Sequence, residues 1–227
     1  MNVFVLCTGR NGSTSFIEAC KYINNYTSEH QSRCFEMAEE RLNFDDNHIE
    51  SDNRLSWFLG KLDRKYGDEA YYVHLKRNPE ASARSFVKKF GTGITAAFYP
   101  GLITRNTNFE DDLRGVKENI QYELCLDMID TVDTNIELFL KDKTKKITID
   151  LESVKEGFEI FWKEINAEGD LSGALASWDI RHNANNPYKD GKYTLRPKIE
   201  RNPVKLKAIY RKIHRAMKKL PKFIKEA

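Results

Sequence analysis

A short turn rich in glycine and hydroxyl side chains follows the first apolar run of the chain. The turn is GRNGST, residues 9–14, and it comes after the run VFVL at residues 3–6. Such a run is typical of a buried strand, and Ser13 or Thr14 is a good cap for a following helix. Backbone amides at a helix start point outward, and the helix dipole favours negative charge. The turn therefore predicts a binding site for an anionic group.

The turn lacks the lysine that loops of nucleotide-hydrolysing proteins carry. Aligned with the pattern GxxxxGK[ST], Gly12, Ser13 and Thr14 fill the last three positions, so Ser13 replaces the lysine. That lysine normally reaches the terminal phosphates, and its loss argues against ordinary hydrolysis of ATP or GTP. Arg10, inside the same turn, is the candidate for the missing positive charge.

A second group of anion-binding side chains follows a later strand. Residues 70–75, AYYVHL, are rich in aromatic and β-branched side chains and predict a strand. Arg77 comes after this strand, Pro79 suits the first turn of a helix, and Ser85 lies eight residues beyond Arg77. The planar donor fork of an arginine and the hydroxyl of a serine are well suited to phosphate. We therefore expect Arg77 and Ser85 to converge on one anionic group.

The two groups together resemble the two cofactor motifs of the sulfotransferases that use 3′-phosphoadenosine 5′-phosphosulfate (PAPS). In that family the first loop binds the 5′-phosphosulfate, and an Arg and a Ser eight residues later hold the 3′-phosphate. GRNGST matches the loop, and Arg77, Pro79 and Ser85 match the spacing of the second motif. The resemblance covers at least residues 1–90 and is similar to bacterial members whose acceptors include carbohydrates and lipid-linked sugars.

The resemblance implies an enzyme that transfers the sulfuryl group of PAPS, without a metal, to a hydroxyl acceptor on a carbohydrate or glycolipid. Arg10 and the loop amides are expected to stabilise charge on the leaving 5′-phosphate. In the stretch WDIRHNA, which resembles the C-terminal part of the bacterial proteins, Arg181 and His182 are further candidates for the cofactor. The expected cofactor-binding residues are Arg10, Asn11, Gly12, Ser13, Thr14, Arg77, Ser85 and Arg181.

The acceptor hydroxyl needs a base, and the resemblance points to the loop after the first helix. The bacterial proteins carry a Gly-His-Glu segment there, and this chain has SEHQS at residues 28–32. Gln31, which follows the histidine, cannot act as a base. We therefore favour His30, then Glu29, with Glu50 at the end of the next predicted strand as a third candidate.

Two functions of other kinds stay open beside the sulfotransferase. One is a P-loop kinase that phosphorylates a small molecule with Mg-ATP. The other is a non-catalytic adaptor for membranes or nucleic acid, built on a degenerate loop.

The elements that carry these residues alternate between strands and helices. This alternation predicts an α/β fold of three layers, P-loop-like, with a central parallel sheet flanked by helices. Residues 24–34 and the glycine-containing residues 91–114 are expected to lack regular structure, the latter as a mobile segment. His74, inside a strand, is expected to be a satisfied sheet histidine. The predicted strands are residues 3–6, 48–51, 70–75 and 146–150, and the predicted helices are residues 13–23, 36–41, 53–66, 80–89, 120–140 and 154–165.

The last 32 residues carry most of the positive charge. They hold 12 Lys and Arg against two Glu, a net +10, so residues 1–195 carry −7 of the total of +3. Apolar residues recur there at spacings of three and four, which predicts a basic amphipathic helix. We therefore divide the chain into a sulfotransferase-like domain, residues 1–195, and a helix, residues 196–227, packed on it or extending from it.

Two interpretations of the basic helix stay open. It either packs on the domain with a solvated outer face, or contacts anionic membrane lipid or a charged glycan acceptor. A nucleic-acid partner is not expected, because no aromatic stacking platform accompanies the basic face.

Composition limits the class of protein. The 227 residues are 40% hydrophobic and 31% charged, which is ordinary for a globular protein, and no apolar run is long enough to span a membrane. The N-terminus lacks the features of a signal peptide, so the expected location is the cytoplasm. Four separated cysteines without a CxxC pair suggest neither a zinc site nor a disulfide scaffold.

Overall fold

A computed structural model describes residues 1–99, 102 and 116–180 of the chain. They belong to one of the two units into which the chain divides, Met1–His182, the other being Asn183–Ala227. Several predictions lie outside the described residues: Arg181 and His182 as binding residues, the domain boundary at residue 195, the basic helix, and most of the segment that ends at residue 114.

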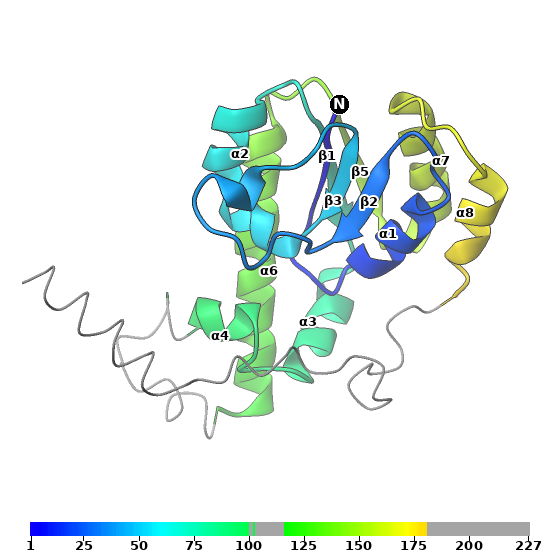
Figure 1. Ribbon diagram of the computed structural model, residues 1–227. Helices are drawn as coiled ribbons and strands as arrows, with labels where there is room; N and C mark the ends of the chain where they lie inside the picture. Colours follow the sequence, from blue (N-terminus) through cyan, green and yellow to red (C-terminus); the bar gives the residue numbers. More distant parts are fainter. Residues whose placement is uncertain (100–101, 103–115, 181–227) are drawn as a thin grey trace, which may run out of the picture. The chain divides into compact units, whose positions relative to one another are not determined.

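Within the described part of the chain, five parallel strands form one sheet, in the order β2-β3-β1-β4-β5 (Figure 1). The structure therefore confirms the α/β class and the parallel sheet. Four strands were expected from the sequence and lie where they were predicted, β4 within one residue. The strands are β1 (Val3–Leu6), β2 (Thr27–His30), β3 (His48–Ser51), β4 (Tyr71–Lys76) and β5 (Lys146–Asp150).

The strand that was not predicted is β2. It lies within residues 24–34, which were expected to form a loop, and that expectation is wrong. Its sequence, TSEH, is polar on both faces, so it lacks the apolar alternation by which a strand is predicted. β2 is an edge strand, and its pairing with β3, Thr27 to His48 through His30 to Ser51, keeps it in the sheet.

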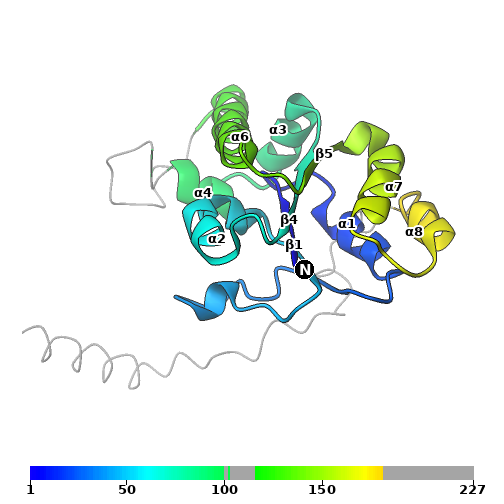
Figure 2. The ribbon, with the colours of Figure 1, turned by 90° about the horizontal axis from the view of Figure 1, so that it is seen from above.

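Helices cover both faces of the sheet (Figure 2). One face is covered by α1 (Ser13–Cys20), α7 (Val154–Glu164) and α8 (Leu171–Ser177), and the other by α2 (Leu59–Tyr66) and α6 (Glu118–Leu140). α3 (Pro79–Val87) packs against α6, as does the short α4 (Ile94–Phe98), which lies in a segment expected to lack regular structure. Among the described helices, none is both long and apolar enough to cross a membrane.

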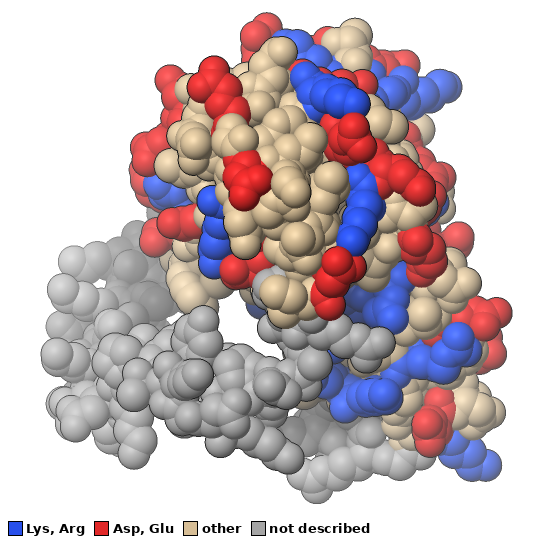
Figure 3. All heavy atoms as spheres, turned by 90° about the vertical axis from the view of Figure 1, so that its right-hand side faces the viewer, with Lys and Arg blue, Asp and Glu red and all other residues tan. Residues whose placement is uncertain are grey.

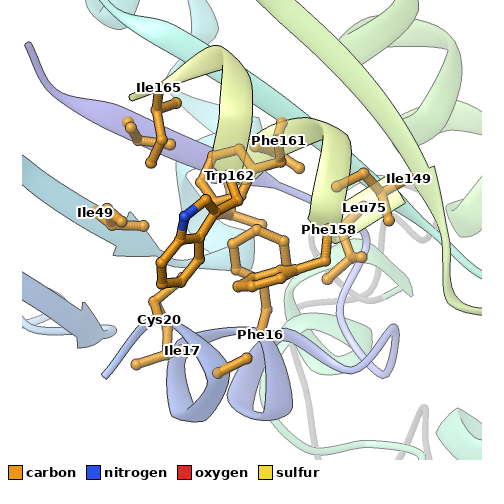
Figure 4. Packing of buried hydrophobic residues seen from close by; sticks show 14 of the residues in the cluster. Phe16, Ile17, Cys20, Ile49, Leu75, Ile149, Phe158, Phe161, Trp162 and Ile165 are labelled. Atoms are coloured by element: carbon orange, nitrogen blue, oxygen red, sulfur yellow. The ribbon is translucent and has the colours of Figure 1, made fainter. Parts of the chain in front are cut away.

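Side chains of successive residues in β1 enter different cores, one on each face of the sheet. Val3 and Val5 pack beneath α1 and α7, while Phe4 and Leu6 pack beneath α2 and α6. Phe16 and Phe158 lie edge to face in the first core, with ring centroids 5.3 Å apart (Figure 4). Burial of a large apolar side chain stabilises a fold by roughly 1.5–3 kcal/mol, so the first core, which contains Phe16, Ile17 and Cys20, holds α1 in place behind the turn.

Three other expectations about helices are corrected. Residues 36–41 form no α-helix, because Ala38 has a φ of 54° in the left-handed region, and only the 3-10 turn η1 (Glu40–Leu42) follows. Residues 53–66 form two pieces, the 3-10 helix η2 (Asn53–Trp57) and α2, which are separated at Phe58. The cap of α1 is Gly12 rather than a hydroxyl residue.

The long helix α6 confirms the predicted stripe except at its start. Met128, Val132 and Ile136 are buried as expected, whereas Ile120 is 46% exposed. His74 is buried and its Nε2 lies 3.1 Å from Oδ1 of Asp133 in α6, which confirms the expectation of a satisfied histidine. On the face that carries α7 and α8, acidic and basic side chains are interspersed (Figure 3).

Candidate functional site

The glycine-rich turn lies where β1 ends, between the carboxyl ends of β3 and β4. Ligands of open α/β sheets bind at such an edge, next to the strand at which the connections change direction. Gly9, Arg10 and Gly12 have φ values of 93°, 62° and 85°, all in the left-handed region. A non-glycine residue in such a conformation costs roughly 1–3 kcal/mol and persists only where neighbours hold it.

Side chains beneath the turn hold it in this shape. Asn11 is buried, and its Nδ2 donates to the carbonyl of Leu75 at 3.0 Å while its Oδ1 accepts from Thr8 at 2.8 Å. Ser56 Oγ accepts from the amide of Cys7 and donates to its carbonyl, at 3.3 and 3.0 Å. The side chain of Asn11 thus links the turn to β4. Of this residue, which was predicted to bind the cofactor, only the backbone amide is left for a ligand.

Both glycines of the turn have a left-handed φ, and side chains from other segments lie close to each of them. A Cβ on Gly12 would lie 2.7 Å from Cδ1 of Leu151, which follows β5, and a Cβ on Gly9 would lie 3.1 Å from Nδ2 of Asn53. The segments after β3 and β5 therefore press against the turn from two sides. Neither segment was identified as part of the site from the sequence.

The backbone of the turn has donors that the described residues leave unused. Within the described part of the chain, the amides of Arg10, Asn11 and Gly12 donate no hydrogen bond. Successive amides in a turn with left-handed residues form a concave site for anions. Ser13 and Thr14 follow in the first turn of α1, both partly exposed, so their hydroxyls extend the same edge.

Arg10, Arg77 and Ser85 meet beside this turn. Arg10 Nε donates to Ser85 Oγ at 2.9 Å, and Arg77 Nη1 donates to the carbonyl of Arg10 at 2.9 Å. Partial burial, and then the charge of Arg77, lower the pKa of Arg10. Among the described residues, neither arginine has an acidic partner within ion-pair distance. An anion bound here would relieve the repulsion between the two guanidinium groups.

A carboxylate that the sequence did not reveal fixes the turn after β4. Glu152 Oε1 accepts from the amide of Asn78 at 3.0 Å, and Asn78 Oδ1 caps α3 by accepting from Ala81 at 2.9 Å. Glu152 follows β5 and lies 74 residues from Asn78 in sequence. Arg77 is therefore held between a bonded turn and the first loop.

His30 ends β2 and reaches the start of α1. Its Nε2 lies 3.1 Å from Ser13 Oγ, and the ring is partly buried. Burial lowers the pKa of His30, the carboxylates of Asp52 and Glu50 raise it, and Arg54 lowers it. The net lowering favours the neutral imidazole, which is the form that accepts a proton.

The other two candidate bases lie on the opposite face of the sheet. Glu29 pairs in register with Glu50, and Glu50 with Phe4, whose side chain faces α2 and α6, whereas His30 pairs with Ser51. Glu50 is fully buried and accepts from Ser32 N at 3.0 Å, from Ser32 Oγ at 2.5 Å and, at 3.2 Å, meets Nε2 of His48. Glu29 is exposed.

Asp52, directly after β3, is a further buried carboxylate at this edge. It accepts from the buried Arg41 and, at 2.9 Å, from the amide of Arg54. Its charge is thus neutralised by a guanidinium that comes from η1. Nothing in the sequence around Arg41 indicates this pairing.

The arrangement combines a turn whose backbone amides are unused by the described residues, two arginines and a histidine with a lowered pKa, without a free carboxylate among them. Cys7, also at the turn, is buried, and burial raises the pKa of its thiol to about 12, so it is no nucleophile at neutral pH. In residues 1–99 and 116–180, no group of three or more His, Cys, Asp or Glu side chains is arranged to hold a metal ion.

No protein-family model and no curated protein matches the chain.

Proposed function

We propose that the chain is a PAPS-dependent sulfotransferase that transfers a sulfuryl group to a hydroxyl acceptor. The observation that carries the proposal is the meeting of Arg10, Arg77 and Ser85, which come from two motifs more than 60 residues apart. The donor needs two anion sites, one for its 5′-phosphosulfate and one for its 3′-phosphate. The free amides of the turn fit the first group, and Arg77 with Ser85 fits the second.

We also propose that the α/β fold is of the P-loop-like kind, with three layers. The support is the succession of β1, a turn with three left-handed residues, and α1, at the strand where the sheet connections change direction. The serine at the lysine position is consistent with a loop that binds a phosphosulfate.

In the proposed reaction, each group of the site has one task. The acceptor oxygen attacks sulfur in line, the bond between sulfur and the 5′-phosphate oxygen breaks, and its electron pair stays on that oxygen. The turn amides and Arg10 stabilise this charge. His30 Nε2 takes the acceptor proton, and Ser13, its present partner, is positioned to donate to the sulfonate. Arg10 donates to Ser85 through Nε only, so its two Nη groups remain available for this charge.

The side chains available at this edge of the sheet disfavour a kinase that uses Mg-ATP. Magnesium prefers oxygen ligands, chiefly carboxylates and phosphates. The two buried carboxylates of this edge are engaged: Asp52 accepts from Arg41, and Glu50 accepts from Ser32. Using either as a metal ligand would break a buried, bonded pair.

The acceptor is proposed to be a carbohydrate or glycolipid, and the enzyme to act in the cytoplasm. The basic segment, residues 196–227, would give it peripheral contact with anionic membranes. A nucleic-acid partner is not part of the proposal.

Calorimetric titration with 3′,5′-adenosine bisphosphate tests the cofactor assignment. We expect saturable binding in the micromolar to millimolar range, without magnesium. Arg77→Ala should weaken it by roughly 10- to 100-fold, because a hydrogen bond to a charged group contributes about 1.5–3 kcal/mol. Binding of 5′-AMP should change far less.

Arg84→Ala is the matched control, because Arg84 lies on α3, the helix that follows Arg77 and carries Ser85, is exposed, and pairs with Glu80 at 3.3 Å. It should leave both affinities unchanged. No binding of the bisphosphate would refute the assignment, and equal losses of bisphosphate and 5′-AMP in Arg77→Ala would remove Arg77 from the 3′-phosphate.

A further inference from the structure

The turn that follows His30 is strained and is held by several contacts. Gln31 has a φ of 57°, in the left-handed region, and its amide donates to the carbonyl of Ser51 at 3.1 Å. Its side chain donates to Asn53 Oδ1 at 3.0 Å. Ser32 then donates to Glu50 through both its amide and its hydroxyl. Because His30 directly precedes this turn, these contacts hold the backbone from which its ring extends toward Ser13.

Glu50 is itself held from behind. His48, in the same strand, lies with Nε2 3.2 Å from Glu50 Oε2 and with Nδ1 2.8 Å from Thr27 Oγ1. The His48 ring stacks on Phe44, with centroids 5.3 Å apart and planes 10° apart. Both oxygens of Glu50 therefore have partners, and the side chain has no exposed surface through which it could meet an acceptor.

We propose that Glu50 is a positioning residue that fixes the turn after β2 through Ser32 and so holds Nε2 of His30 against Ser13. The role is chemical as well as mechanical, since the Glu50 charge also reaches the imidazole. The inference rests on the proposed function in one respect only, that His30 is the base. Under this proposal Glu50 is not the base itself but the residue that positions the base, His30.

The groups that face His30 predict the sign of the effect. Asp52 and Glu50 favour the imidazolium, Arg54 opposes it, and Ser13 is the partner of Nε2. Removing the charge of Glu50 therefore lowers the pKa of His30 below its value in the native protein. It also weakens the link to Ser32, because a glutamine offers one neutral acceptor oxygen where the carboxylate offers two charged ones.

The test is an NMR titration of the histidine rings in the full chain, with His30 assigned by the loss of its signal in His30→Gln. Glu50→Gln should lower the pKa of His30 and shift the amide signals of residues 31 and 32. Glu29→Gln is the matched control, since Glu29 is the register partner of Glu50 but is exposed. It should change neither. An unchanged His30 titration in Glu50→Gln, or equal shifts in both variants, overturns the proposal.

Kinetics separate positioning from a general loss of structure. With PAPS and an acceptor, Glu50→Gln should lower kcat by roughly 10- to 100-fold at unchanged KM for PAPS, as expected for a misplaced base. Glu50→Asp, which keeps the charge but retreats from Ser32, should lower kcat while the His30 titration stays near that of the native protein. Native kcat in Glu50→Asp contradicts the positioning role.

The test still gives an answer if Glu50→Gln does not fold, or if the native protein does not bind 3′,5′-adenosine bisphosphate. If Glu50→Gln does not fold, Ser32→Ala replaces it, because Ser32 is exposed and loses only the hydroxyl donor. It should speed hydrogen exchange of the residue 32 amide, and native exchange there contradicts the clamp. If the native protein fails to bind 3′,5′-adenosine bisphosphate, the proposed function fails, yet the titration still decides whether Glu50 holds His30.

Discussion

Burial of the His30 imidazole determines how the proposed activity depends on pH. The pKa of His30 lies below its ordinary value of 6.5, so the neutral base persists into mildly acidic solution. The rate should therefore fall only when the pH drops below this lowered pKa. We expect the acid limb of kcat/KM, measured as sulfuryl transfer from PAPS against pH, to lie below pH 6.5 and to vanish in His30→Gln.

Replacing Arg54 tests whether the charges around His30 set the position of this acid limb. It is one of the charges that lower the pKa of His30, so Arg54→Gln should move the acid limb to higher pH. Arg84→Gln, at an exposed arginine on α3, should leave the limb in place. A limb that stays fixed in Arg54→Gln, or moves to lower pH, would contradict the proposed base.

At the scale of elements, α7 approaches β5 unusually closely. A Cβ on Gly157 of α7 would lie 2.8 Å from Cγ2 of Ile149 and 3.1 Å from its Cγ1. Figure 4 shows Ile149 and Phe158 in the core that this approach closes. Gly157→Ala gains helix propensity of up to about 1 kcal/mol, but overpacking costs about 1–3 kcal/mol. We expect the free energy of unfolding, measured by urea titration, to fall by about 1 kcal/mol.

Gly60→Ala is the control for this prediction, because Gly60 lies in α2 and a Cβ added there would meet no atom within 4 Å. It should raise the free energy of unfolding by about 0.5 kcal/mol. Adding Ile149→Ala to Gly157→Ala should cost less than the sum of the single changes, since the clash is then gone. Stabilisation by Gly157→Ala similar to that at Gly60 would mean that α7 and β5 pack less tightly.

At the scale of the whole molecule, charge is divided sharply along the chain. Residues 196–227 carry +10 and residues 1–195 carry −7. Clustered Lys and Arg near an anionic lipid surface contribute about 1 kcal/mol each, and salt screens this attraction. We expect the full chain to co-sediment with phosphatidylserine vesicles at low salt, less so at high salt, and not with phosphatidylcholine vesicles.

A chain ending before Pro203 supplies the control for vesicle binding. It loses most of the basic residues of the tail and should bind phosphatidylserine vesicles much more weakly, while keeping its affinity for 3′,5′-adenosine bisphosphate. Loss of both would link the tail to the cofactor instead. Undiminished vesicle binding would place the lipid contact elsewhere.

The sequence by itself determined the features that depend on local chemistry. Short local segments predicted β1, β3, β4 and β5, β1 from an apolar run and β4 from aromatic and β-branched side chains. Apolar residues that recur every four positions predicted α6. The spacing of Arg77 and Ser85 after a strand, and the composition of the first turn, indicated an anion site. These patterns can be recognised in the sequence because the residues that form each pattern are close together along the chain.

Only the tertiary structure decided which of the candidates meet. β2 has no apolar signal and exists because it pairs with β3. His30 contacts Ser13, whereas Glu29 and Glu50 face the other side of the sheet, and a one-residue difference within a strand reverses the face. Arg10 reaches Ser85 across 75 residues, and Asp52 pairs with Arg41 through a turn that propensity did not predict. Such contacts depend on the order and register of the strands, and these cannot be inferred from residue types and their local spacing.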